Sequence, residues 1–149
     1  RTRGLPPSVL DFNCRSPQEL LKRVAVEIFG KMESLHVEVS EFLHRTELNI
    51  VNEDEPVKEC VQRQIIEMKD LLKMERNEYE ILLLPVMRES NHPMQTSIDI
   101  LELNRLRRGL LLDAYIWDRR LCHVDSVLKA HGHISKTNPN SLDNLLYTR

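Results

Sequence analysis

The sequence is poor in glycine, cysteine and long hydrophobic runs, and each shortage excludes a class of function. Only four of the 149 residues are glycine, too few and too scattered for a glycine-rich loop that cradles a phosphate through backbone N–H groups. The three cysteines, Cys14, Cys60 and Cys122, show no C-x-x-C spacing, so neither a disulfide framework nor a zinc ribbon is expected. The longest uncharged apolar run covers only residues 81–87, far short of the roughly 20 residues that span a bilayer. These shortages predict a protein of a reducing compartment with no nucleotide site and no transmembrane helix.

An excess of one charge is also missing. Lys and Arg number 21 against 23 Asp and Glu, a formal net charge of -2, whereas dedicated nucleic-acid binders are strongly basic. We therefore expect no nucleic-acid partner. The size, 149 residues and 17.5 kDa, suits one domain that can fold without a metal or a disulfide. Because the chain begins with Arg1 and not with Met, we interpret it as a piece of a longer protein.

What the sequence does contain is three long proline-free stretches with a helical period. Proline breaks a helix interior but is tolerated in the first turn, so the seven prolines read as boundaries. The predicted helices cover residues 17–48, 55–88 and 97–131. Ser16 before Pro17, with Glu19 three residues later, predicts a capping box for the first helix, and Ser97 is the predicted cap of the third. Pro85 is expected to end or kink the second helix.

Each predicted helix carries one row of residues at alternating spacings of about four and three, the pattern of a helix that packs against others. The first row is apolar throughout and consists of Leu21, Ala25, Ile28, Met32, Leu35, Val39 and Phe42. The second consists of Val57, Val61, Ile65, Met68, Leu72, Glu75, Tyr79, Leu82 and Val86. The third consists of Ile100, Leu103, Arg107, Leu110, Ala114, Trp117, Leu121, Val124 and Leu128. Glu75 and Arg107 are the charged interruptions of the second and third rows.

Helices about 45 Å long at 1.5 Å per residue, joined by short connections, predict an all-α fold, an antiparallel three-helix bundle of the spectrin-repeat type. The bundle would cover residues 17–132. Residues 1–16 are expected to form an extended arm, and residues 133–149, rich in Asn, Ser, Lys and Pro, a linker or flexible, disordered tail. The same rows could pair two chains in a coiled coil, an alternative that the periodicity leaves open.

Two predictions concern side chains inside the bundle. Trp117, in the third row, is expected to be largely buried. If the second and third helices lie antiparallel with Val86 opposite Ile100, Arg107 falls about one helical turn from Glu75. An unpaired buried charge costs several kcal/mol, so we predict that these two side chains pair and fix the helix register. The alternative is that both reach from the edge of the row to water.

The third predicted helix is the basic one. Its arginines could contact acidic lipid headgroups or an acidic partner; they are Arg105, Arg107, Arg108, Arg119 and Arg120. Nearby carboxylates of the same helix could instead pair with them; the candidates are Glu102, Asp113 and Asp118. We expect an internally paired face, with an acidic-partner contact through Arg105, Arg108, Arg119 and Arg120 as the alternative.

The densest group of potential metal ligands lies near the end of the third helix: Cys122, His123, His131 and His133. No H-E-x-x-H or paired-cysteine spacing connects them, and histidines suit the negative end of a helix dipole. We therefore predict no metal site, no cofactor and no catalytic residue in this chain.

Residues 98–121, I-D-I-L-E-L-N-R-L-R-R-G-L-L-L-D-A-Y-I-W-D-R-R-L, resemble a segment of the plant-type phosphatidylinositol-3-phosphate 5-kinases, the PIKfyve family. The L-E-L-N-R-L-R-R and Y-I-W-D motifs carry the resemblance, and L-P-P-S-V-L-D-F at residues 5–12 resembles the entry to the same region. In that family the region is helical, resembles spectrin repeats, and lies between the chaperonin-like and cysteine-rich modules and the C-terminal kinase domain.

The resemblance implies a parent enzyme that uses ATP and Mg²⁺ to convert phosphatidylinositol 3-phosphate to phosphatidylinositol 3,5-bisphosphate at the cytoplasmic face of endosomal and vacuolar membranes. It implies that this segment is a non-catalytic spacer that contacts other domains of the kinase or scaffold proteins of its complex. Two alternatives unrelated to a kinase stay open: a cytosolic bundle that binds phosphoinositides or an acidic partner, with peripheral membrane contact, and a self-associating coiled coil.

Overall fold

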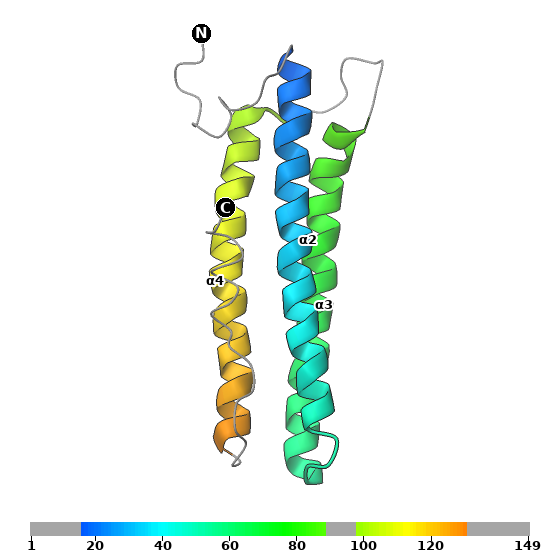
Figure 1. Cartoon of the computed structure of the whole chain (residues 1–149), viewed down its shortest axis with the longest axis vertical. Coiled ribbons are helices and arrows are strands. Elements are labelled where there is room, and N and C mark those ends of the chain that lie inside the picture. The colour runs from blue at the N-terminus through cyan, green and yellow to red at the C-terminus, as the bar shows by residue number, and fades with distance from the viewer. Residues whose placement is uncertain (1–15, 89–97, 131–149) are drawn as a thin grey trace.

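The computed structural model describes residues 16–88 and 98–130. Within these ranges the chain forms three α-helices and no strand: α2 (Pro17–Asn49), α3 (Glu55–Met87) and α4 (Ile100–Ala130). In Figure 1, α2 and α4 run in one direction and α3 runs in the opposite direction beside them. The fold is therefore the antiparallel three-helix bundle that the proline positions and the helical rows predict, with helix ends within three residues of the predicted ones.

The starts of the helices follow from capping chemistry. The hydroxyl of Ser16 accepts a hydrogen bond from the backbone N–H of Glu19 at 3.1 Å, which confirms the predicted cap of α2. The α4 helix is capped by Asp99, whose carboxylate accepts from the backbone N–H of Glu102 at 2.9 Å. The predicted cap Ser97 lies outside the described residues. The α3 helix continues two residues past Pro85 and ends at Met87, so this proline sits in its last turn, as predicted.

The core forms along the predicted rows. Every member of the α2 row is buried except Leu21, which is half-buried. The α3 row departs from the prediction at one place: Leu82 is 43% exposed whereas Leu83 is fully buried. A strict seven-residue repeat drifts around a straight helix of 3.6 residues per turn. The step after Tyr79 is therefore four residues instead of three.

Three of the predicted features lie partly or wholly outside the described residues. These are the extended arm over residues 1–16, the tail over residues 133–149, and the ligand pair His131 and His133. Among the helices that the structure does describe, none combines the length and the apolar character that crossing a membrane requires.

Replacing Gly30 by alanine is expected to stabilise the protein. Gly30 lies in the middle of α2, and a Cβ built on it meets nothing within 4 Å. Glycine inside a helix costs about 0.5–1 kcal/mol relative to alanine, so Gly30→Ala should raise the free energy of unfolding by that amount. Urea denaturation followed by circular dichroism measures it. Gly109 in α4 has equally open space, so Gly109→Ala is the matched comparison, and a destabilised Gly30→Ala protein beside a stabilised Gly109→Ala protein would contradict the prediction.

Candidate functional site: a polar layer across the three helices

The charged residue that interrupts the α3 row lies at the centre of a polar layer that joins all three helices. Both carboxylate oxygens of Glu75 accept from the indole N–H of Trp117 in α4, at 3.0 and 3.1 Å. The Nε2 atom of His36 in α2 lies 3.2 Å from the same carboxylate. Arg120 in α4 adds an ion pair at 3.7 Å, and its guanidinium lies 4.6 Å from the centre of the Trp117 ring. One carboxylate thus ties α3 to both of its neighbours.

A second hydrogen bond lies one turn further along. The hydroxyl of Tyr79 in α3 donates to the Asp113 carboxylate in α4 at 2.8 Å. Tyr79 follows Glu75 by four residues, and Asp113 precedes Trp117 by four, which is the order expected of two antiparallel helices whose neighbouring turns face each other. The two contacts together set the register between α3 and α4.

The electrostatics of the layer keep Glu75 ionised and Tyr79 protonated. Burial alone would raise the pKa of Glu75, but hydrogen bonds from His36 and Trp117 and the nearby positive charges lower that pKa below its usual value. Burial, with the adjacent Asp113 carboxylate, raises the pKa of Tyr79 far above its usual range. Burial also raises the pKa of Asp113, against the lowering effect of the Tyr79 hydrogen bond.

These shifts favour a structural role over a catalytic one. A general base needs a pKa near the working pH and a free lone pair aimed at a substrate. The pKa of Glu75 is shifted away from neutrality, and its oxygens already accept from Trp117. Tyr79 is held as a neutral phenol by the same burial. The arrangement is suited to holding three helices at one level.

The predicted pair of Glu75 with Arg107 is wrong. Arg107 instead donates to Glu27 in α2, at 3.4 Å, and to the side chain of Asn104. The prediction assumed that α3 ends level with the start of α4. In the observed register Arg107 is level with Pro85, about ten residues or about 15 Å along the axis from Glu75. Arg107 pairs with α2 instead of α3, and Glu75 pairs with α4 as predicted but through Arg120 and Trp117.

Trp117 is fully buried, which confirms its prediction. Its contact with Glu75 was not foreseen, nor was the role of His36 or of the Tyr79–Asp113 pair. The signal that could have found them is complementarity: polar residues on facing rows must be satisfied together when buried. The third row offers Glu75 two donors, Arg107 and Trp117, and only the register that pairs Glu75 with Trp117 also places Tyr79 opposite Asp113.

The expected pairing along α4 is wrong for all five of its arginines. Arg120 pairs with Glu75, and Arg107 with Glu27. Arg105, Arg108 and Arg119 are exposed and form no ion pair with any residue of the described ranges. Of the predicted carboxylate partners, Asp113 accepts from Tyr79 of α3, Asp118 is buried, and Glu102 is exposed without an ion pair to a described residue.

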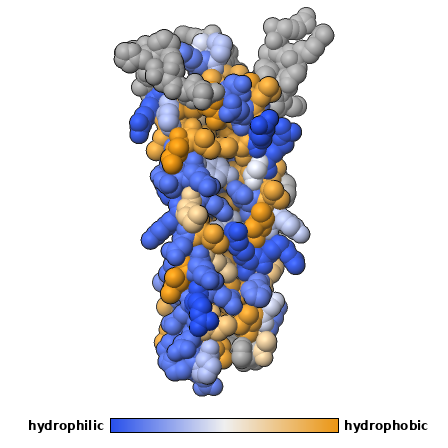
Figure 2. All heavy atoms as spheres, turned by 180° about the vertical axis from the view of Figure 1, so that it is seen from behind, coloured by the Kyte–Doolittle hydropathy of each residue, from blue (hydrophilic) through white to orange (hydrophobic). Residues whose placement is uncertain are grey.

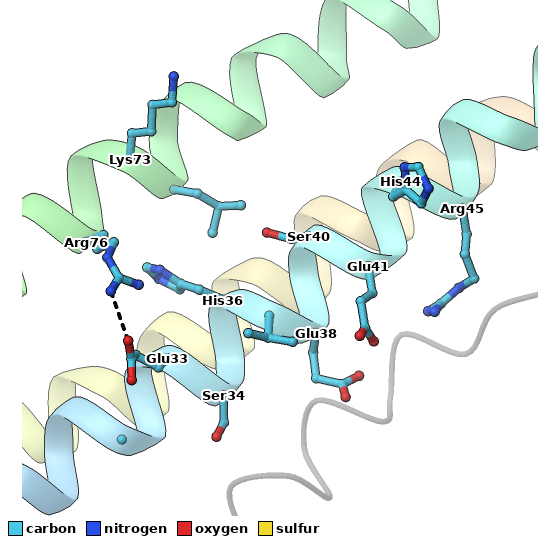
Figure 3. A pocket seen from close by; sticks show the side chains of 13 residues that line it. Glu33, Ser34, His36, Glu38, Ser40, Glu41, His44, Arg45, Lys73 and Arg76 are labelled. Carbon is cyan, nitrogen blue, oxygen red and sulfur yellow. Dashed lines mark hydrogen bonds and ion pairs between the residues drawn. The ribbon is translucent and has the colours of Figure 1, made fainter.

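A groove of about 950 Å³ lies along α2 and α3, with Gly30, His36 and Leu72 among its lining residues. Figure 3 shows Arg76 of α3 reaching across to Glu33 of α2, at 2.9 Å. Glu80 also pairs with Arg76 at 3.0 Å. The Arg76–Glu33 pair links α3 to α2 beside the groove, whereas the Arg76–Glu80 pair lies within α3.

No group of three or more His, Cys, Asp and Glu side chains within residues 16–88 and 98–130 is placed to hold a metal ion. Of the sequence candidates, Cys122 is half-buried and His123 is exposed. Burial raises the pKa of the Cys122 thiol, which reduces the thiolate that binds metals or attacks substrates.

Taken together, the fold and the polar layer define a helical bundle whose convergent titratable groups hold helices to one another. No family model matches the chain, and no solved structure matches it. Curated proteins do: the chain is homologous to a segment of the 1-phosphatidylinositol-3-phosphate 5-kinases of Arabidopsis thaliana, which confirms the resemblance of residues 98–121.

The similarity extends over most of this chain and a small part of each relative. The putative 1-phosphatidylinositol-3-phosphate 5-kinase FAB1C is 42% identical over 127 residues, which are 84% of this chain and 8% of that protein. The 1-phosphatidylinositol-3-phosphate 5-kinase FAB1B is 31% identical over 125 residues, 84% of this chain and 6% of that protein. FAB1A is 30% identical over 130 residues, with 84% and 7% covered. The chain therefore spans less than a tenth of these relatives.

Proposed function

We propose that this chain is a non-catalytic helical segment of a larger phosphatidylinositol-3-phosphate 5-kinase, where it serves as a rigid spacer and a contact surface for other domains or scaffold proteins. The observation that carries the proposal is the homology to a small internal part of three proteins named as such kinases. The polar layer supports it, because its titratable side chains hydrogen-bond to one another across the helices.

In this proposal the chemistry belongs to the rest of the parent protein. A kinase domain elsewhere would bind ATP and Mg²⁺ and phosphorylate phosphatidylinositol 3-phosphate to the 3,5-bisphosphate. The bundle would act at the cytoplasmic face of endosomal or vacuolar membranes as part of a peripheral protein. Three helices of about 50 Å, at 1.5 Å per residue, give the segment the length and stiffness that a spacer between domains needs.

An exchange experiment tests the proposal. The matching segment of Arabidopsis FAB1B is replaced by residues 16–130 of this chain, and turnover of phosphatidylinositol 3-phosphate is measured in the purified hybrid. The expected result is turnover within about threefold of FAB1B, because the exchanged segment contributes shape and contacts and no group that touches substrate. A folded hybrid with no turnover would contradict the proposal.

A second hybrid, with an unrelated three-helix bundle of equal length, separates the two parts of the role. Turnover and complex assembly that match FAB1B would assign the segment a spacer role alone. Turnover or assembly that is lost only in this second hybrid would assign it specific contacts.

A further inference from the structure

The outward face of α4 carries a second row of residues at helix-packing spacing. Leu101, Arg105, Arg108, Leu112, Tyr115 and Arg119 follow one another at spacings of four and three, and all of them are exposed. We name these six residues the outer α4 row. Its three apolar members are exposed by 64%, 59% and 58%, in chain order. Alternation of four and three is the spacing with which one helix packs its side chains between those of another.

The charge of this row has one sign. Arg105, Arg108 and Arg119 are its charged members, and none of them forms an ion pair with a described residue. The carboxylates of α4 are not members of this row: Asp113 accepts from Tyr79, Asp125 pairs with Lys129 at 3.4 Å, and Asp118 is buried. Glu102, three residues before Arg105, is exposed and forms no ion pair with a described residue. A solvated helix face normally mixes both signs, whereas this row combines large apolar side chains with arginines alone.

A hollow of about 380 Å³ adjoins the C-terminal half of the row. Tyr115, Ile116 and Met68 give it apolar walls, and Arg119, Arg120 and His123 are its basic members. Met68 belongs to α3 and the other lining residues to α4, so an apolar side chain docked in the hollow would contact both helices. Figure 2 shows apolar side chains that reach the surface among hydrophilic ones. The exposed apolar side chains of α2 and α3 have carboxylates as well as basic residues near them in the sequence.

We propose that the outer α4 row docks an acidic amphipathic helix of a partner protein. Carboxylates of the partner would face Arg105, Arg108 and Arg119, and its aliphatic side chains would pack against Leu112 and Tyr115. Opposite charges at a helix–helix seam select the partner and its register. This inference rests on the proposed role as a contact segment, and it names the chemistry of the partner.

Three other occupants fit the row less well. A helix that lies in a bilayer has its basic residues beside an apolar face, whereas here the arginines lie in line with the apolar residues and would enter to the same depth. A second copy docked through the same row would set arginine against arginine. The chain's own residues 1–15 and 131–149 each contain more basic than acidic side chains, so neither offers the complementary charge.

A peptide titration tests the inference on this chain. The probe is a synthetic helical peptide with alternating leucine and glutamate at its packing positions, and the matched peptide has lysine in place of glutamate. Fluorescence anisotropy follows binding at low and high salt. We expect saturable binding of the acidic peptide, about tenfold or more tighter than the lysine peptide, and weaker at high salt because exposed charges are screened.

Two charge-reversed variants make the test specific. The triple variant Arg105→Glu, Arg108→Glu and Arg119→Glu should bind the acidic peptide about tenfold or more weakly and should now prefer the lysine peptide, while an unchanged circular dichroism spectrum shows that it is folded. The control variant Arg45→Glu, Arg63→Glu and Arg88→Glu changes the net charge equally at exposed arginines elsewhere. Its affinity for the acidic peptide should stay within about twofold.

Several results would overturn the inference. If the acidic peptide does not bind saturably, or if both triple variants lose the same affinity for it, the outer α4 row is not a docking surface. Phosphatidylserine-containing vesicles that bind through these arginines while the acidic peptide does not would assign the row to a membrane. Sedimentation that shows a dimer dissolved by the first triple variant would assign it to a second copy. Because the titration uses this chain alone, its failure is distinguishable from a failed exchange in FAB1B.

Discussion

Trp117→Ala is expected to lower the free energy of unfolding by about 3–5 kcal/mol, the usual cost of truncating a fully buried aromatic side chain. Trp117 is completely inaccessible to solvent, and its indole N–H is donated to Glu75. The truncation therefore opens a cavity between α3 and α4 and removes a donor from a half-buried carboxylate. Urea denaturation monitored by circular dichroism measures the loss.

Two further variants separate the contributions. Trp117→Phe keeps most of the ring and removes the N–H, so it should cost about 1–3 kcal/mol, the penalty of a buried acceptor that loses its partner. Tyr115→Ala, two residues away and 58% exposed, should change stability by no more than about 0.5 kcal/mol. If Trp117→Ala and Tyr115→Ala had the same small effect, the packing of α4 described above would be wrong.

Glu75→Gln is expected to lower the free energy of unfolding by about 2–4 kcal/mol at neutral pH. Hydrogen bonds to a charged acceptor contribute about 1.5–3 kcal/mol, and breaking a buried charged contact costs more because the remaining partner stays buried. The amide keeps the shape of the carboxylate but loses one acceptor and the charge that faces His36 and Arg120. Glu67→Gln, at an exposed position of the same helix, is the matched control with an expected change of about 0.5 kcal/mol or less.

The same variant has a pH signature. The folded pKa of Glu75 is lowered from 4.5, so the carboxylate contributes stability that is fully present above the unfolded pKa and is lost as pH falls through the folded pKa. The stability gap between the wild-type chain and Glu75→Gln should therefore narrow progressively as the pH falls below 4.5. A gap that stays the same down to pH 3 would show that ionisation of Glu75 does not contribute.

The rows of the three helices could be predicted from sequence because each helix buries a stripe whose spacing follows from 3.6 residues per turn. Leu82 shows where that reasoning fails. The choice between Leu82 and Leu83 depends on how a long helix drifts against its neighbours, and both residues are leucine, so composition does not decide it. The structure buries Leu83.

The register between α3 and α4 could not be predicted from the rows. A slide by one or two turns leaves apolar residues facing apolar residues, and only the buried polar groups distinguish one register from the next. Three such groups decide it here: Glu75, Tyr79 and Trp117. Arg107 misled the prediction because Glu75 was considered as its partner and Glu27, on the outer part of α2, was not.

The outer α4 row was hidden for a related reason. On an isolated helix the carboxylates near the arginines look available for pairing, but in the bundle Asp113 accepts from Tyr79 of α3. Arg105, Arg108 and Arg119 are exposed and form no ion pair with a described residue. The sequence contains the row, but only the bundle shows which side of α4 faces water.

We propose that the convergent titratable groups hold the bundle and perform no chemistry, and variants of the full-length kinase to which this segment is proposed to belong test this most directly. His36→Gln and Tyr79→Phe are introduced together, and thermal unfolding and turnover of phosphatidylinositol 3-phosphate are measured on the same preparation. We predict a lower unfolding temperature, with turnover per folded molecule within about twofold of the wild-type protein. A folded variant whose turnover falls about 100-fold or more, the contribution expected of a general acid or base, would contradict the account.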